Sequence, residues 1–376
     1  MVTMAPGPST KHHWVFSVDF LLVATTILVA TVGVVMVYTA TRWNLIAQGL
    51  SPHYFLYRQA AYVALGVGAM VVTALFDYRK LEPFAMAIYG LIILSLVGVF
   101  VVGSHALGSQ RWYSFGPLQL QPSEFAVLGL ILAVATYCSR RTEGLTWRDV
   151  SRLLILAGVP IVLVMIQPDL GTAIIMVIVL FVMLAVAGLP GRVLFILVAS
   201  GVVVIVVALV GGFLHHYQIA RLTSFLHQGG GIQQPGIYNL VQAKDAIGSG
   251  GIWGTGLGRG VQTNLGYVPE QQTDFIFTAV GEQLGFVGAS IVLGLLGFIT
   301  WRILRAAQVA RDPFGRLLCA GVFTFVGFSV FQNAGMTMGI MPITGIPLPF
   351  VSYGGTAVLC FFLAVGLALS VYARRH

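Results

Sequence analysis

The sequence has little charge. Asp, Glu, Lys and Arg make up only 9% of its 376 residues, whereas they make up ~25% of an ordinary soluble domain. Hydrophobic residues account for 57%, and the mean hydropathy is +0.91. Apolar stretches recur along the chain, and a stretch of ~20 residues can cross the ~30 Å of bilayer hydrocarbon. The composition excludes a soluble globular domain and predicts an all-α, polytopic integral membrane protein.

Cysteine is also scarce. Cys138, Cys319 and Cys360 all lie in apolar runs, where a thiol behaves as a small buried hydrophobic group. They therefore predict neither a disulfide framework nor a metal-ligand pattern. The eight His residues show no H-E-x-x-H spacing, and the adjacent pair His215 and His216 lacks the third ligand that a zinc site needs.

The apolar stretches predict about ten transmembrane helices within one membrane domain, residues 1–376. The predicted spans are 20–41, 59–76, 83–103, 123–138, 153–167, 170–188, 193–214, 274–300, 317–341 and 354–373.

The 20 basic residues exceed the 12 acidic ones, and in a membrane protein this excess indicates loop topology rather than nucleic-acid binding. With a cytoplasmic N-terminus, 14 of the 20 Lys and Arg fall on the cytoplasmic side. Three of the other six lie in the longest loop, residues 215–273, where the positive-inside bias is weaker. Both termini are therefore predicted to be cytoplasmic, and the long loop between spans seven and eight is extracytoplasmic.

The long loop has a segment with helical periodicity, residues 235–247. Apolar residues lie near one face of this helix and polar residues lie on its other faces. This pattern predicts an amphipathic helix at the membrane surface. The apolar residues on that face are Ile237, Leu240, Val241 and Ile247.

The predicted orientation sorts the acidic residues. Six lie on the cytoplasmic side or at its helix ends, where neighbouring basic residues suffice to explain them. The other six lie on the outer side or in the outer half of a span. They are Glu124, Asp169, Asp245, Glu270, Asp274 and Glu282.

Asp274 admits two interpretations. With Thr273 as N-cap, Asp274 would be a first-turn carboxylate that stabilises span eight through the helix dipole. Alternatively, it lies at the outer interface and meets lipid headgroups there. Glu282 lies ~12 Å deeper at ~1.5 Å per residue, where an ionised side chain must face a polar partner or a wet cavity. We expect Glu282 and Glu124 to line one polar cavity with Asp274.

Two further segments could contact anions. The glycine-rich run GSGGIWGTGLGRG, residues 248–260, could approach phosphate through backbone N–H groups. It lacks P-loop spacing, however, and its composition favours a flexible loop. Arg111 has the aromatic neighbours Trp112, Tyr113 and Phe115. It is either part of an interfacial aromatic belt or a cation at the membrane surface that meets an anionic headgroup.

Five segments, in this order and spacing, resemble the shape, elongation, division and sporulation (SEDS) family, and the RodA branch more than FtsW. The similarity covers nearly the whole chain. The segments are GSQRWYSFGPLQLQPSE (108–124), QPDLGTA (167–173), QAKDAIGSGGIWGTGLGRG (242–260), YVPEQQTDFIFTAVGEQLGFVG (267–288) and GIMPITGIPLPFVSYGGTA (339–357).

The resemblance implies a peptidoglycan glycosyltransferase that polymerises lipid II at the outer face of the cytoplasmic (inner) membrane during cell elongation. It also implies a class B penicillin-binding protein as the crosslinking partner, together with other membrane proteins of the elongation machinery. The family's essential acid, in the motif TDFIF, falls on Asp274. Two positions depart from the family pattern: Val127 stands in place of a lysine, and Gln283 in place of a second acid.

Such a polymerase lets a sugar hydroxyl attack an anomeric carbon whose leaving group is a lipid-linked pyrophosphate. A carboxylate can accept the hydroxyl proton, while cations or a divalent metal offset the leaving charge. Asp274 is the predicted base or, alternatively, a ligand of Mg²⁺ or Mn²⁺. The candidate substrate-binding residues are Arg111, Glu124, Lys244, Arg259 and Glu282.

Two other functions stay open at this point. A transporter or flippase for the same lipid also needs a wet cavity, but its polar groups would lie near the midplane, whereas these cluster on the outer side. A non-catalytic scaffold of the elongation machinery would tolerate loss of Asp274.

Overall fold

The computed structural model describes residues 18–106, 109–115, 118–141, 144–210, 225 and 235–375. Each of the ten predicted spans coincides with a helix. These helices are α1 (Phe20–Ala47), α2 (Tyr54–Leu75), α3 (Ala85–Val102), α4 (Pro122–Ser139), α5 (Trp147–Ile166), α6 (Leu170–Val186), α7 (Gly191–Val210), α11 (Ile276–Gln308), α12 (Pro313–Thr337) and α13 (Gly355–Ala373).

Hydropathy supports the membrane assignment. Eight helices of the described chain are long and apolar enough to cross a membrane, with the 3-10 helix η2 (Tyr78–Phe84) and α3 counted as one. The shorter apolar helices α6 and α7, the latter counted over residues 191–203, fill the other two predicted spans. The predicted polytopic, predominantly helical fold is confirmed.

The segment between α3 and α4 contains strands, which the sequence analysis did not predict. The strands β1 (Ser104–Ala106), β2 (Ser109–Phe115) and β3 (Leu118–Leu120) form an antiparallel sheet in the order β1-β2-β3. Trp112, Tyr113 and Phe115, the aromatic neighbours of Arg111, are also residue types that favour strands. Tyr113 on β2 pairs with Leu120 on β3 and donates its hydroxyl to the carbonyl of Ser95 on α3 (2.9 Å).

The centre of the bundle is formed by α4 and α13. In each of these helices, 83% of the residues in an apolar 18-residue stretch are buried inside the protein, against 17% in α2 and 22% in α11. The helices α4 and α13 therefore face protein rather than lipid. Val127, at the position where the SEDS family has a lysine, lies on α4 and is fully buried. This position therefore carries an apolar core residue in this chain.

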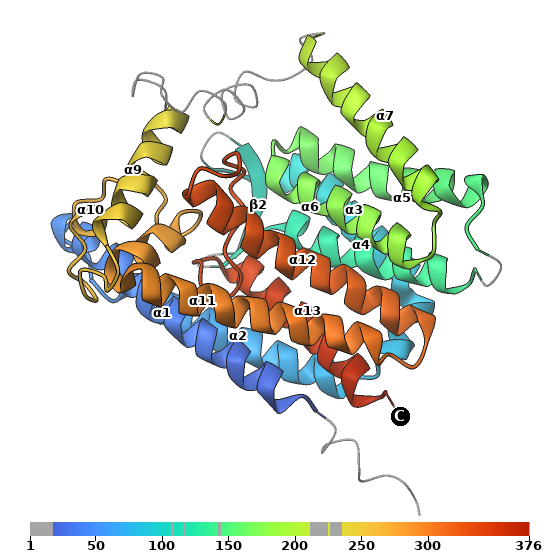
Figure 1. Ribbon diagram of the computed structural model, residues 1–376, viewed down its shortest axis with the longest axis horizontal. Helices are drawn as coiled ribbons and strands as arrows, with labels where there is room; N and C mark the ends of the chain where they lie inside the picture. Colours follow the sequence, from blue (N-terminus) through green and yellow to red (C-terminus); the bar gives the residue numbers. More distant parts are fainter. Residues whose placement is uncertain are drawn as a thin grey trace, which may run out of the picture.

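Two short helices of the long loop lie at the end of the bundle opposite the C-terminus, which we call the loop end (Figure 1). The predicted loop helix is present as α9 (Pro235–Ser249), followed by α10 (Val261–Asn264). Ile237 and Leu240 on α9 are buried, and α9 packs on α11 and α12. Its predicted place at the membrane surface stays a prediction, and residues 215–224 and 226–234 of the loop lie outside the described residues.

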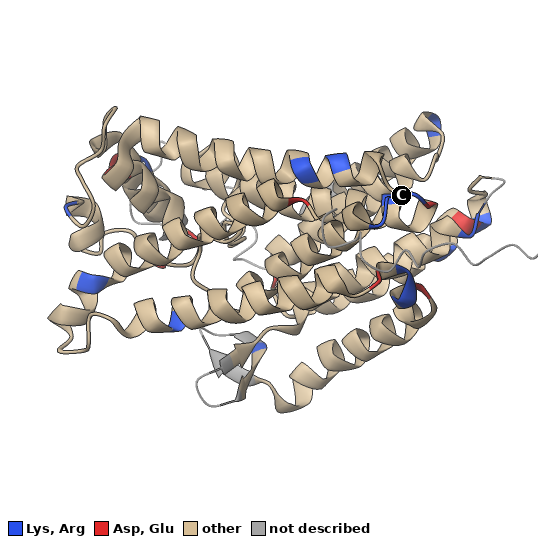
Figure 2. Cartoon of the chain, turned by 90° about the horizontal axis from the view of Figure 1, so that it is seen from below, with Lys and Arg blue, Asp and Glu red and all other residues tan. Residues whose placement is uncertain are grey.

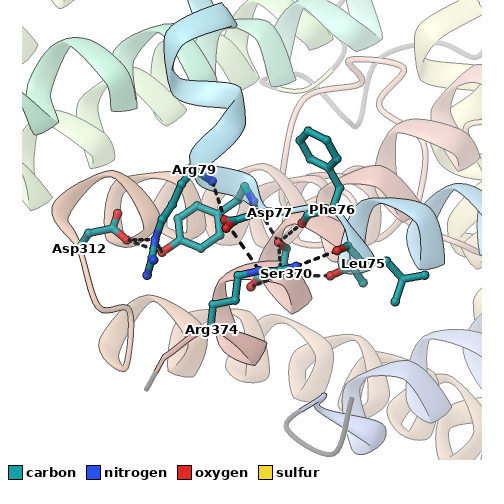
Figure 3. A network of polar contacts seen from close by, with 9 residues as sticks. Leu75, Phe76, Asp77, Arg79, Asp312, Ser370 and Arg374 are labelled. Atoms are coloured by element: carbon teal, nitrogen blue, oxygen red, sulfur yellow. Dashed lines mark hydrogen bonds and ion pairs between the residues drawn. The ribbon is translucent and has the colours of Figure 1, made fainter. Parts of the chain in front are cut away.

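Polar contacts fasten the helix ends at the C-terminal end of the bundle (Figure 3). Ser370 on α13 donates its hydroxyl to the Phe76 carbonyl (2.6 Å) and accepts from the Tyr78 backbone N–H (3.2 Å). Arg374 donates to the Leu75 carbonyl (2.7 Å). These bonds satisfy backbone N–H and C=O groups of residues 75–78, where α2 ends and η2 begins. The end of α13 therefore holds these two helix ends together.

Charged residues lie mainly toward the ends of the helices (Figure 2). Because successive spans alternate in direction, all but five of the described Lys and Arg residues belong to the C-terminal end. The five at the loop end are Arg42, Arg58, Arg111, Lys244 and Arg259.

Candidate active site

Asp274 precedes α11 instead of lying in its first turn. The helix begins at Ile276 with Phe275 as its N-cap, and Phe275 makes no side-chain capping bond. Thr273 donates its hydroxyl to the Glu270 carbonyl (3.1 Å), and Glu270 has φ +50°. The prediction of a Thr273 cap with a first-turn Asp274 is therefore wrong, because a separate turn over residues 270–275 delays the helix.

The Asp274 backbone is held by Asn333 on α12. Asn333 Nδ2 donates to the Asp274 carbonyl (2.8 Å) and to the Ile346 carbonyl (2.7 Å), and the Asn333 side chain is fully buried. The Tyr353 N–H donates to the Gln272 carbonyl (2.8 Å). Residues 270–275 are thus fastened to α12 and to the segment 338–354 between α12 and α13.

The Asp274 carboxylate lies against Gly345 of this segment. A Cβ at Gly345 would lie 3.1 Å from Asp274 Oδ2, and Gly345 has φ +75°. Both the backbone conformation and the space beside the carboxylate therefore favour glycine. Asp274 is half-buried, so its carboxylate is held in place yet accessible.

Glu124 is a second acid at the loop end, and the predicted polar cavity that it would share with Asp274 and Glu282 stays a prediction. Glu124 lies in the first turn of α4 and is 8% exposed. Asp169 and Asp274 are the charged groups that act on its carboxylate. The structure therefore gathers three acids from α4, the start of α6 and the start of α11 at the loop end.

Asp169 in this group has an architectural role. It is the N-cap of α6 and accepts hydrogen bonds from the Ser123 hydroxyl (2.8 Å), the Gln121 amide (3.0 Å) and the Thr172 hydroxyl (2.9 Å). These bonds join the starts of α4 and α6. They fix the wall of the site on which Glu124 lies.

Arg111 on β2 contacts this wall. Its guanidinium donates from Nη2 to the Pro168 carbonyl (2.5 Å), next to Asp169 in sequence. Arg111 is half-buried, and its Nε is buried without a hydrogen-bond partner. Arg111 therefore lies beside the start of α6 at the loop end, and its contact with an anion stays a prediction.

Glu282 has polar partners, as expected, but they belong to α10. Its carboxylate accepts from the backbone N–H of Gln262 (2.8 Å), the N–H of Thr263 (2.9 Å) and the Thr263 hydroxyl (2.5 Å). The side chain is fully buried. Glu282 therefore holds the first turn of α10 onto α11, which is a scaffold contact rather than a surface offered to substrate.

The glycine-rich run is an ordered strap across a break in α11 rather than a flexible loop. Gly285 inside α11 has φ 67° and ψ −169°. Strap residues close the break: the Thr255 N–H donates to the Glu282 carbonyl (3.0 Å), and the Phe286 N–H donates to the Gly251 carbonyl (2.9 Å). Backbone groups freed by the break are thereby satisfied, as apolar surroundings require.

The remaining two cations come from the same loop. Lys244 lies half-buried on α9, which packs on the two helices that flank Asp274. Arg259 lies exposed at the end of the strap. Both stay candidates for substrate contact at the loop end.

The part of the chain that the structure describes has no group of three or more His, Cys, Asp or Glu side chains arranged to hold a metal ion. Mg²⁺ is often bound by only one or two carboxylates together with substrate phosphates. The donor set here fits that second arrangement, with Asp274 as the carboxylate, and not an all-protein metal site.

The sequence matches known membrane proteins over nearly its whole length. Residues 19–376 match the family model of FtsW, RodA and SpoVE, described as "Cell cycle protein". The chain is 33% identical to the peptidoglycan glycosyltransferase MrdB of Escherichia coli (strain K12), over 99% of this chain and 98% of that protein. It is 34% identical to stage V sporulation protein E of Bacillus subtilis (strain 168), over 95% and 98% of the two chains.

Solved structures share the fold. The rod shape determining protein RodA of Thermus thermophilus superposes with a TM-score of 0.70 and 29% identity, over 96% of this chain and 98% of that one. A second chain comes from work on the structural coordination of polymerization and crosslinking by a peptidoglycan synthase complex. It superposes with a TM-score of 0.80 and 30% identity, over the same shares of the two chains.

Proposed function

We infer that this chain, which belongs to the FtsW, RodA and SpoVE family of cell cycle proteins, is a peptidoglycan glycosyltransferase. One observation supports a catalytic role for a particular residue, Asp274. Asp274 is an accessible carboxylate whose backbone is pinned by a buried amide and whose Oδ2 lies beside a glycine. It also occupies the position that the resemblance gives to the essential acid.

The proposed reaction polymerises lipid II. A sugar hydroxyl of one substrate attacks the anomeric carbon of another, and a new C–O bond forms as the bond to the lipid-linked pyrophosphate breaks. Asp274 accepts the proton of the attacking hydroxyl. The pyrophosphate leaves with its lipid, and cations at the loop end offset its charge.

The neighbouring residues divide into supports and candidate contacts. Asn333, Gly345 and Asp169 fix the backbone and walls, whereas Glu124 lies within electrostatic reach of the Asp274 carboxylate. Arg111, Lys244 and Arg259 are the candidate phosphate contacts of this proposal. A divalent cation, Mg²⁺ or Mn²⁺, would be held by Asp274 together with substrate phosphates and would supply further charge neutralisation.

We place the reaction at the outer face of the cytoplasmic membrane, with both termini in the cytoplasm. The distribution of Lys and Arg supports this orientation, because the C-terminal end of the bundle carries most of them. The solved neighbour from a complex of polymerization and crosslinking supports a crosslinking partner. We propose that this partner is a class B penicillin-binding protein and that the chain acts in cell elongation.

The decisive experiment is polymerisation of purified lipid II by the protein and by its Asp274→Asn variant. The substitution keeps the side-chain shape but removes the charge and the proton-accepting capacity. We expect the rate to fall by at least ~100-fold, the low end of general-base contributions. Asp245→Asn is the matched control, because Asp245 is an exposed acid on α9 at the same end, and it should leave the rate nearly unchanged.

The rival functions predict different results. A flippase would move lipid II across liposome membranes without forming glycan strands. A scaffold would keep its partners and its cellular role in the Asp274→Asn variant. Polymerisation by a folded Asp274→Asn protein at the normal rate would contradict the assignment of this residue.

A further inference from the structure

Arg58 is a cation near the start of α2 that the sequence analysis did not single out. Its Cζ lies 4.4 Å from the centroid of the Tyr54 ring. Its guanidinium also lies near the Tyr353 hydroxyl, within electrostatic range of it. Arg58 is half-buried. Its side chain lies where α2 meets the segment 338–354.

A continuous set of contacts joins Arg58 to the candidate active site. Tyr353 donates its backbone N–H to the Gln272 carbonyl (2.8 Å), two residues before Asp274. Gln59 follows Arg58 and donates its buried amide to the Ser352 carbonyl (3.1 Å). The start of α2 is thus fastened to the same segment that places Gly345 beside the Asp274 carboxylate.

Arg58 has no anionic partner within the described chain. Five Arg residues there form ion pairs with carboxylates: Arg79, Arg140, Arg141, Arg302 and Arg374. Arg58 is not among them. Burial, first of all, raises the pKa of Tyr353 to about 12, so Tyr353 is neutral at physiological pH and supplies no counter-charge.

The aromatic surroundings orient the cation without neutralising it. The Tyr353 ring contacts Phe55 edge-on (centroids 4.9 Å apart) and lies 6.0 Å from the Tyr62 ring. Aromatic rings of this kind occur at the level of the lipid headgroups. A guanidinium held there by ring faces still has donors for an anion, and its planar fork suits two phosphate oxygens.

We propose that Arg58 binds a phosphate of the lipid-linked pyrophosphate substrate at the membrane end of the candidate active site. The inference rests on the proposed function and adds a binding residue to it. The base lies on one side of the reacting sugar, so the leaving group has to lie away from Asp274. Arg58 meets this requirement, because the start of α2 reaches the Asp274 turn indirectly, through Ser352 and Tyr353 of the segment 338–354.

Binding can be measured without turnover. The protein is placed in nanodiscs of zwitterionic phosphatidylcholine and titrated with farnesyl pyrophosphate and with farnesol. We expect farnesyl pyrophosphate to bind more tightly, and Arg58→Gln to weaken it by roughly 10-fold or more, as for loss of a charged hydrogen bond. Farnesol binding should not change. Arg58→Lys keeps the charge but loses the planar guanidinium that can donate two parallel hydrogen bonds. Its affinity for farnesyl pyrophosphate should therefore lie between those of the unaltered protein and of Arg58→Gln.

Arg42 supplies the matched control. It lies exposed at the loop end of α1, its Cζ is 5.4 Å from the Trp43 ring, and it too pairs with no described carboxylate. Arg42→Gln removes the same charge from the same end of the bundle. Equal losses in the Arg42 and Arg58 variants would show a general field effect and overturn the site.

Competitors identify the source of the phosphate. Inorganic pyrophosphate and phosphatidylglycerol should displace farnesyl pyrophosphate poorly, because the first lacks the lipid and the second lacks the pyrophosphate. Equal displacement by phosphatidylglycerol would make Arg58 a general headgroup contact and contradict the proposal. Wild-type affinity in a folded Arg58→Gln protein, checked by size-exclusion chromatography, would also contradict it.

Failure of the broader function is distinguishable from failure of this site. If the unaltered protein does not polymerise lipid II but binds farnesyl pyrophosphate through Arg58, the glycosyltransferase assignment fails and the anion site stands. If the unaltered protein polymerises lipid II and Arg58→Gln leaves kcat/KM unchanged, the site fails and the assignment stands.

Discussion

Asn333 holds Asp274 in place through the backbone, with its Nδ2 at 2.8 Å from the Asp274 carbonyl oxygen. The same amide reaches the Ile346 carbonyl, one residue after Gly345. One buried side chain thus sets the distance between the turn that carries the carboxylate and the segment that the carboxylate lies against. The accessible acid is positioned by a residue whose own side chain is fully buried.

Asn333→Ala should therefore lower kcat far more than it raises KM. Small misplacements of a catalytic group can cost ~100-fold in rate, and loss of Asn333 frees the backbone of Asp274. Gln332→Ala is the matched control, because the buried Gln332 donates to the Pro342 carbonyl of the same segment (2.8 Å) and has no bond to residues 270–275. Steady-state polymerisation by both variants, with melting temperatures alongside, separates the two roles. Equal effects of the two substitutions on kcat would show that Asn333 acts only through stability.

Gly285→Ala should destabilise the protein strongly. A Cβ at Gly285 would lie 2.2 Å from the Gly254 backbone nitrogen, and the residue has φ 67°. Left-handed strain alone costs ~1–3 kcal/mol, and the clash would separate the strap from α11. Gly248→Ala is the control, since nothing lies within 4 Å of its would-be Cβ and its φ is ordinary. Thermal unfolding followed by size-exclusion chromatography should show a lower melting temperature for the first variant only.

The spans were open to prediction because hydropathy over ~20 residues depends on composition and little else. The break in α11 was not. Residues 276–308 are apolar over most of their length, and a single glycine among 45 gives no signal. What breaks the helix is the strap packed across it, which is a contact between segments. The same holds for the start of α11, where Thr273 and Asp274 have the pattern of a cap but the backbone of Glu270 delays the helix.

Parts of the site were within reach of the sequence. Asp274 and its closeness to Glu124 follow from the resemblance and from the cost of burying carboxylates in a membrane. Gln332 and Asn333, two polar residues inside the span 317–341, could have been identified in the same way, because burying polar groups in a membrane is costly. Arg58 could not, because its lack of a carboxylate partner becomes visible only once the spans are packed.

Breaking the buried ion pair between Asp19 and Arg302 should destabilise the C-terminal end of the bundle. Asp19 caps α1, and its Oδ2 lies 2.6 Å from Arg302 Nη2, with the two side chains only 2% and 9% exposed. Arg302→Leu leaves the Asp19 charge unpaired, which typically costs ~3–5 kcal/mol. The double variant Asp19→Asn/Arg302→Leu removes both charges and keeps a capping side chain, so it should regain much of the lost melting temperature. A double variant as unstable as Arg302→Leu alone would show that packing, not the unpaired charge, sets the cost.

Single cysteines should report the orientation of the chain in the membrane. Cys138, Cys319 and Cys360 are buried, so they should react little with a membrane-impermeant maleimide, and their replacement by Ala removes the residual signal. Arg42→Cys lies exposed at the loop end, and Lys80→Cys lies exposed at the C-terminal end. The positive-inside bias predicts that intact cells label position 42 and that position 80 reacts only after permeabilisation. The reverse pattern would place Asp274 and Arg58 on the cytoplasmic side, where they could not act on a substrate at the outer face, and would contradict the proposed orientation.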